Sequence, residues 1–146
     1  MSKSIKKLLL NSEDINRKLV RISHEIIEKN TNVDDLLLIG ILSRGEPIAN
    51  RIRTNIKKIT NKNVNIGSLD ITFHRDDFRE RLVVPQVKGT SIDDDINDKV
   101  LVLVDDVLYT GRTIRAAMDE LNTFGRPSKI QLAVLVDRGH REVPIR

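Results

Sequence analysis

Two adjacent aspartates and a hydroxyl-rich segment follow the most apolar stretch of the chain. Asp105 and Asp106 come directly after residues 100–104, which are all Val or Leu. Carboxylates held at such a place can accept hydrogen bonds from sugar hydroxyl groups or meet a hydrated divalent cation. Residues 110–113 (Thr-Gly-Arg-Thr) then open a predicted helix, whose free backbone amides and positive dipole end can surround a phosphate dianion. The combination predicts a site for a phosphorylated sugar.

The same residues also fit a purely structural explanation. In that case residues 110–113 only cap a helix, and Asp105 and Asp106 are solvated carboxylates. Both explanations stay open on spacing alone. A nucleotide-binding loop of the Walker type is excluded, because no Gly-Lys-Ser/Thr sequence is present.

The spacing of apolar residues predicts two helices around a buried strand in the first part of the chain. A helix starts at Ser12, which is followed by two acidic residues, and its apolar face repeats at steps of 4, 3 and 4 through Ile15, Leu19, Ile22 and Ile26. Residues 36–41 form a nearly continuous apolar run, as expected for a strand buried on both faces of a parallel sheet. Pro47 suits the first turn of a second helix that continues to Ile59.

The second part of the chain predicts three strands and one more helix. Residues 64–73 alternate in two phases with Gly67 at the slip, which predicts a strand with a bulge there. Residues 100–104 and 130–136 read as strands, and a helix spans about residues 114–124 before Gly125 and Pro127 end it. The order predicts an α/β fold, a mostly parallel sheet flanked by helices.

Three loops follow strand ends and carry the unusual residues. They are residues 43–45, 105–113 and 137–141. Ligands of open α/β sheets bind beyond the carboxyl ends of the strands, so we expect these loops to converge. The polar stretch at residues 74–98 is long for a loop in a small domain, which indicates a functional or disordered segment.

Length and composition limit the possible classes of protein. The chain has 146 residues, which predicts a single domain over residues 1–146. It contains no cysteine and three histidines, which excludes a disulfide scaffold, a thiolate zinc site and a cysteine nucleophile. No apolar run approaches the roughly 20 residues that cross a bilayer, and no signal peptide is recognisable, so we expect a cytoplasmic protein with no membrane partner.

The polar face of the first helix is basic. It carries Arg17, Lys18, Arg21, His24 and Lys29, and residues 15–29 have a local net charge of +2. The whole chain has a formal net charge of +4, which permits an anionic partner. Each of these residues could equally be ordinary solvated surface.

Residues 100–113, VLVLVDDVLYTGRT, resemble the motif that binds phosphoribosyl diphosphate (PRPP) in type I phosphoribosyltransferases. Residues 136–146, VDRGHREVPIR, together with residues 108–109, are similar to one branch, the PyrR family. Members of that branch are pyrimidine-operon attenuation regulators and uracil phosphoribosyltransferases. The resemblance runs from about residue 15 to residue 146 and takes in residues 21–25, 43–45, 70–72 and 75–77.

The resemblance implies that uracil and PRPP react to UMP and pyrophosphate with Mg²⁺, which PRPP carries and no protein side chain binds directly. Asp105 and Asp106 would hold the ribose hydroxyls and Arg44 the pyrophosphate, as the catalytic residues. A mobile loop with Arg75 would close over the leaving group. The implied PRPP and UMP site comprises Ser43, Arg44, Gly45, Arg75, Asp105, Asp106, Val107, Leu108, Tyr109, Thr110, Gly111, Arg112 and Thr113.

The resemblance also implies binding to an RNA stem-loop in the leader of pyrimidine operon messages, more tightly with UMP or UTP, and assembly into homodimers or higher homo-oligomers. The candidate RNA contacts are Arg21, His24, Lys29, Arg138, His140, Arg141 and Arg146. Relatives continue beyond residue 146, so we expect a domain that is short at its C-terminus relative to the family. Two alternatives stay open: a phosphoribosyltransferase for another base, and an inactive truncated relative.

Overall fold

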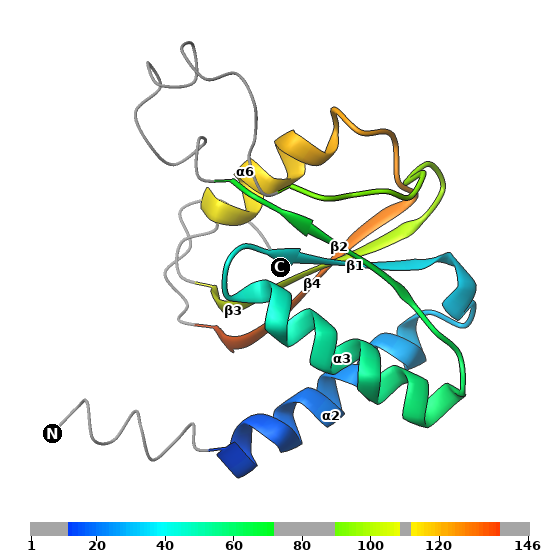
Figure 1. The fold of residues 1–146 in the computed structure, drawn as a ribbon, viewed down its shortest axis with the longest axis vertical. Helices are drawn as coiled ribbons and strands as arrows, with labels where there is room; N and C mark the ends of the chain where they lie inside the picture. Colours follow the sequence, from blue (N-terminus) through cyan, green and yellow to red (C-terminus); the bar gives the residue numbers. More distant parts are fainter. Residues whose placement is uncertain (1–11, 72–89, 109–111, 138–146) are drawn as a thin grey trace, which may run out of the picture.

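The computed structural model describes residues 12–71, 90–108 and 112–137 and shows a parallel sheet flanked by helices (Figure 1). Its elements are α2 (Ser12–Lys29), the short 3₁₀ helix η1 (Val33–Asp35), β1 (Leu36–Ile41), α3 (Gly45–Thr60), β2 (Asn65–Leu69), β3 (Val100–Leu108), α6 (Arg112–Leu121) and β4 (Lys129–Asp137). The strands pair in the order β2-β1-β3-β4, every neighbouring pair being parallel. The predicted α/β fold and the predicted order of elements are confirmed.

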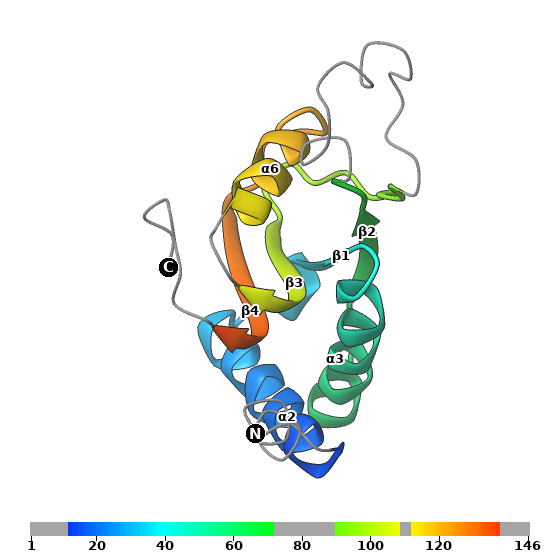
Figure 2. The same cartoon turned by 90° about the vertical axis from the view of Figure 1, so that its left-hand side faces the viewer.

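Helices cover both faces of the sheet, with α2 and α3 on one face and α6 on the other (Figure 2). Leu36 and Leu38 of β1 pack in the core beneath α2 and α3. Leu37, Ile39 and Ile41 pack in the second core, beneath α6. Because successive side chains of a strand point to opposite faces, a strand between two helix layers must be apolar at nearly every position.

The predicted bulge at Gly67 is wrong. β2 pairs with β1 in one uninterrupted register, from Leu37 opposite Asn65 to Ile41 opposite Leu69. The change of phase has another cause, because Val64 belongs to the core beneath α2 and α3 and Leu69 to the core beneath α6. Gly67 makes room for a neighbouring segment: a Cβ there would lie 3.0 Å from the carbonyl oxygen of Ser91.

Three predicted elements have other boundaries in the structure. β2 ends at Leu69, earlier than the strand predicted over residues 64–73. β3 continues to Leu108 and pairs with β4 along its length, so Asp105 and Asp106 lie within the strand and not after it. α6 begins at Arg112 and ends at Leu121, earlier at both ends than predicted. Thr123 and Phe124 follow it in a turn closed by hydrogen bonds to the carbonyls of Glu120 and Leu121.

Polar side chains fasten α2 to the edge strand β4. The Lys18 ammonium donates a hydrogen bond of 3.0 Å to the carbonyl of Leu135, in a half-buried position. The amides of Asn30 and Gln131 exchange hydrogen bonds of 2.9 and 3.2 Å. Lys18 is therefore not a free member of the basic face of α2, contrary to the prediction, because a lysine at the side of a helix can reach an unpaired strand edge.

The turn after β1 lies against the end of β3. Gly45, the first residue of α3, is buried, and a Cβ there would lie 2.1 Å from the carbonyl oxygen of Val104. Only a residue without a side chain allows this approach. The contact holds the turn at residues 42–44 beside Asp105. Within the described ranges, no helix is long and apolar enough to span a lipid bilayer.

Replacing Gly45 with alanine should destabilise the fold, although alanine is the better helix former by about 1 kcal/mol. The added methyl group must displace backbone, and overpacking of this kind costs about 1–3 kcal/mol. Urea unfolding of Gly45→Ala measures this, with Gly67→Ala as the milder comparison, since a Cβ at Gly67 would lie 3.0 Å from its nearest neighbour and a Cβ at Gly45 only 2.1 Å. Equal stability of Gly45→Ala and the parent chain would contradict the assignment.

Candidate functional site

The carboxyl ends of the strands carry acidic and hydroxyl side chains, and Figure 2 views the fold from this side. β1 and β3 are direct neighbours in the sheet, so the turn after β1 lies next to the last residues of β3. Ser43 and Arg44 of that turn are exposed, while Asp105 and Asp106 are half-buried. Two of the three loops expected to converge, after β1 and along β3, therefore lie side by side.

An ion pair joins the two segments. The Arg44 guanidinium lies 3.3 Å from Asp106, Nη1 to Oδ2, with 79% of the Arg44 side chain and 26% of the Asp106 side chain exposed. An ion pair this exposed contributes at most about 1 kcal/mol to stability. The ion pair matters for position more than for stability. It keeps the Arg44 guanidinium beside the Asp106 carboxylate, where an anionic ligand can replace Asp106 as the partner of Arg44.

The carboxylates of the acid pair are oriented by backbone amides. Asp105 Oδ1 accepts a hydrogen bond of 2.8 Å from the amide of Asp106, and Asp106 Oδ1 accepts one of 2.8 Å from the amide of Val107. These bonds fix the direction of each carboxylate. Carboxylate oxygens are acceptors, the groups that sugar hydroxyls require as hydrogen-bond partners.

The N-terminus of α6 lies at the same edge. α6 begins at Arg112, four residues after the end of β3, and Thr113 is half-buried in its first turn. A helix therefore follows the acid pair directly along the chain, as predicted, while its role in binding phosphate stays a prediction. Its positive dipole end favours an anion there.

Part of the predicted site lies outside the described residues. These positions are Arg75, Tyr109, Thr110, Gly111, Arg138, His140, Arg141 and Arg146, and the side chains of Leu108 and Arg112. Val107 lies in β3 with 37% of its surface exposed. The assignments of all these residues to PRPP, UMP or RNA stay predictions.

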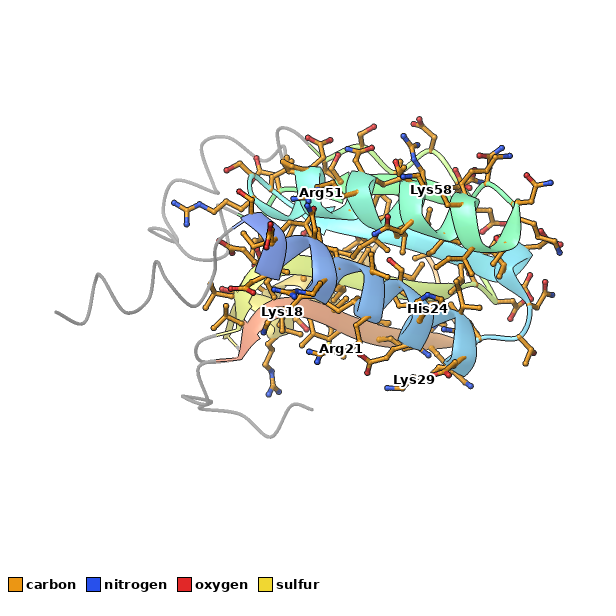
Figure 3. The ribbon with its side chains drawn as sticks, turned by 90° about the horizontal axis from the view of Figure 1, so that it is seen from below. Lys18, Arg21, His24, Lys29, Arg51 and Lys58 are labelled. Carbon is orange, nitrogen blue, oxygen red and sulfur yellow. The ribbon has the colours of Figure 1, made fainter. Side chains whose placement is uncertain are left out.

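The candidate RNA contacts on α2 all lie at the surface. Arg21, His24 and Lys29 are exposed, and Figure 3 shows them along α2. Arg21 Nε lies 3.9 Å from Glu25 Oε1, a solvated pair that salt screens. These side chains are accessible to a large anionic partner.

Sequence reasoning missed two basic residues beside α2. Arg51 and Lys58 lie on α3, and together with Asn55 they repeat at steps of 4 and 3, which places them on one face of the helix. This spacing was a usable signal. The apolar residues of α3 repeat at similar steps, and the prediction used them and Pro47 but not the spacing of the basic residues.

No protein metal site was predicted, and the described residues contain no group of three or more His, Cys, Asp or Glu side chains that could hold an ion. The donors that are present, the carboxylates of Asp105 and Asp106, are hard oxygen donors of the type that Mg²⁺ accepts through its bound waters. They fit a magnesium ion that arrives with a polyphosphate ligand.

Comparisons with known proteins agree with this geometry. The phosphoribosyl transferase domain family matches residues 7–146. The chain is 57% identical over 138 residues to the bifunctional protein PyrR of Clostridioides difficile, covering 94% of this chain and 78% of that protein. It is 56% identical over 138 residues to the PyrR protein of Alkaliphilus metalliredigens, covering 94% and 76%.

Solved structures show the same fold. A hypoxanthine phosphoribosyltransferase from Staphylococcus aureus superposes with a TM-score of 0.71 at 18% identity, over 94% of this chain and 72% of that one. A purine phosphoribosyltransferase from Pyrococcus horikoshii gives a TM-score of 0.66 at 21% identity, over 92% and 79%. The chain is a phosphoribosyltransferase that belongs to the PyrR family.

Proposed function

We propose that the chain transfers ribose 5-phosphate from PRPP to uracil and releases pyrophosphate. The observation that carries this proposal is the acid pair Asp105–Asp106 on β3, with Arg44 in an ion pair to Asp106 and the helix α6 following β3 along the chain. A phosphorylated sugar with a pyrophosphate leaving group complements these residues. Its hydroxyl groups can donate hydrogen bonds to the two carboxylates, its 5-phosphate can bind at the N-terminus of α6, and its pyrophosphate can pair with Arg44.

In this reaction the bond from ribose C1 to the pyrophosphate oxygen breaks, and a bond from C1 to a uracil ring nitrogen forms. Pyrophosphate leaves with the electron pair, and the ring nitrogen loses its proton. Positive charge develops on the sugar ring in between, and the carboxylates of Asp105 and Asp106 stabilise it while holding the ring hydroxyls. No covalent nucleophile is required, so catalysis is mainly positioning and electrostatics.

The turn after β1 receives the leaving group. The amides of Ser43 and Arg44 and the Ser43 hydroxyl are donors that would bind the pyrophosphate, and the Arg44 guanidinium would exchange Asp106 for it. Mg²⁺ bound to PRPP would neutralise charge on the departing pyrophosphate. Because Gly45 approaches the carbonyl of Val104, the turn that receives the pyrophosphate lies against the strand that carries the acid pair.

Removing both charges of the acid pair should abolish UMP formation. Asp105→Asn with Asp106→Asn keeps the shape of the side chains, and we expect kcat/KM for PRPP to fall at least about 100-fold, comparable to the loss of one oxyanion-type group. Asp119→Asn, at an exposed position of α6, is the matched control. Turnover of the double variant at the parent rate would refute the site. UMP absent from parent and variant alike would refute uracil as the substrate, and turnover of another base would then identify it.

Neutralising Arg44 should separate binding from stability. Arg44→Gln loses an exposed ion pair, so the free energy of unfolding should change by less than about 1 kcal/mol. KM for PRPP should rise about tenfold or more, since a charged hydrogen bond is worth about 1.5–3 kcal/mol. Steady-state kinetics with thermal unfolding measures both. A large loss of stability with unchanged KM would show that Arg44 is only structural.

We further propose that the basic face of α2 binds the leader RNA of pyrimidine operons and that uridine nucleotides in the site strengthen this binding. Arg21, His24 and Lys29 support it, because they are exposed on one helix and suit contacts to phosphates. The relatives named above carry the description bifunctional, which agrees with a second activity. Assembly into homodimers stays a prediction.

Removing two cations from α2 should weaken RNA binding and its dependence on salt. Arg21→Gln with Lys29→Gln should reduce the slope of log affinity against log salt by roughly 1.5, the value for two phosphate contacts. Arg115→Gln with Arg126→Gln removes the same charge from exposed residues outside α2. Filter binding of the leader stem-loop, with and without UMP, measures it. Equal losses in both double variants would contradict a specific face on α2.

A further inference from the structure

A groove runs between α2 and α3 on the outer side of the helix layer. It has a volume of about 400 Å³ and is lined by Asn16, Val20, Arg51, Thr54, Asn55 and Lys58. α2 and α3 pack directly against each other along this line. Figure 3 shows Arg51 and Lys58 on α3, beside α2.

The groove is lined by cationic and hydrogen-bond-donating side chains and by no anionic one. It holds two cations, two side-chain amides and one hydroxyl, and no carboxylate. Arg51 and Lys58 are in none of the ion pairs found among the described residues. Amide, hydroxyl and cationic groups all donate hydrogen bonds, so the groove suits a ligand with many acceptor oxygens and negative charge.

The Arg51 side chain is already held across the groove. Its guanidinium donates a hydrogen bond from Nη2 to the side-chain oxygen of Asn16 on α2. A guanidinium has five N–H donors, so others stay available for a ligand. Because the side chain is ordered before a ligand arrives, less conformational entropy is lost on binding.

The groove shares helix α2 with the basic face described above. Val20 lines it with 43% of its surface exposed, and the exposed His24 follows Val20 one helical turn later on α2. An extended anion has room to contact both α2 and α3 here, because exposed basic residues lie on both helices. A lipid surface fits less well, since membrane-binding helices need an apolar face to insert and Val20 is the one apolar residue of this lining.

We propose that this groove binds the sugar–phosphate backbone of RNA, so that the RNA surface spans α2 and α3. The inference rests on the proposed RNA-binding function and adds Arg51 and Lys58 as phosphate contacts. Asn16, Thr54 and Asn55 add neutral donors, and Val20 offers an apolar contact to a ribose.

Two double variants of one helix test the proposal. Arg51→Gln with Lys58→Gln removes two charges from the groove, and Arg53→Gln with Lys57→Gln removes two charges from α3 at positions that do not line it. The probe is the leader stem-loop of a pyrimidine operon of the organism that encodes the chain, bound over a series of salt concentrations. We expect the groove variant to bind about tenfold more weakly, with a slope lower by roughly 1.5, and the control to change the slope by less than about 0.5.

Further measurements keep the outcomes separate. Lys58→Gln alone should lower the slope by about 0.7 to 0.9, and it leaves the hydrogen bond between Arg51 and Asn16 in place. UMP formation should be unchanged in all three variants, which confirms folding. Equal effects of the groove and control variants on RNA binding would overturn the proposal. It would also be overturned if the groove variant kept its RNA affinity but lost binding to phosphatidylserine vesicles. Failure of the parent chain to bind the RNA would reject the RNA-binding function together with this inference, whereas RNA binding sensitive only to Arg21 and Lys29 would reject this inference alone.

Discussion

The close approach of Gly45 to the carbonyl of Val104 is the constraint on which the site depends. It brings the start of α3 against the end of β3, and it leaves no room for a side chain between them. The turn with Ser43 and Arg44 and the strand end with Asp105 and Asp106 consequently form one surface. A second glycine acts the same way within the β1–α3 unit, since a Cβ on Gly40 would lie 2.6 Å from the Cα of Glu46. Both contacts are backbone to backbone, so they fix the backbone of the turn and of the end of β3, from which the side chains of the site project.

The placement of α2 follows from different interactions and serves the proposed second function. Leu19 and Ile26 bury one face of this helix in the core, while Lys18 and Asn30 bind polar groups of β4. β4 ends at Asp137, at the same edge of the sheet as the carboxyl ends of β1 and β3. A helix that presents cations to solvent is therefore fastened to a strand that ends at the edge of the proposed nucleotide site.

The fold was largely predictable, because a sheet with helices on both faces imposes simple patterns. The apolar run of β1 indicates a buried strand, and the steps of 3 and 4 in α2 and α3 indicate amphipathic helices. The bulge at Gly67 was a wrong prediction, since alternation cannot distinguish a bulge from a strand buried on both faces. Asp105 and Asp106 were predicted to follow the strand because the apolar run ends at Val104, whereas pairing with β4 continues the strand to Leu108.

The site was predictable in its parts and not in its geometry. Asp105, Asp106 and residues 43–45 stood out because polar residues directly follow apolar strands. The ion pair between Arg44 and Asp106 joins residues 62 positions apart, and no local pattern indicates such a partner. The donor-lined groove between α2 and α3 also depends on packing. Its lining residues come from two helices, and the sequence pattern does not predict how these helices are oriented relative to each other.

The most direct test of the account is a crystal structure of the chain with PRPP and Mg²⁺. The account predicts that the ribose hydroxyls lie within hydrogen-bonding distance, about 2.5–3.0 Å, of the carboxylates of Asp105 and Asp106. It also predicts the pyrophosphate at the turn formed by Ser43, Arg44 and Gly45. A sugar bound away from the end of β3, or a pyrophosphate bound away from that turn, would contradict the central claim.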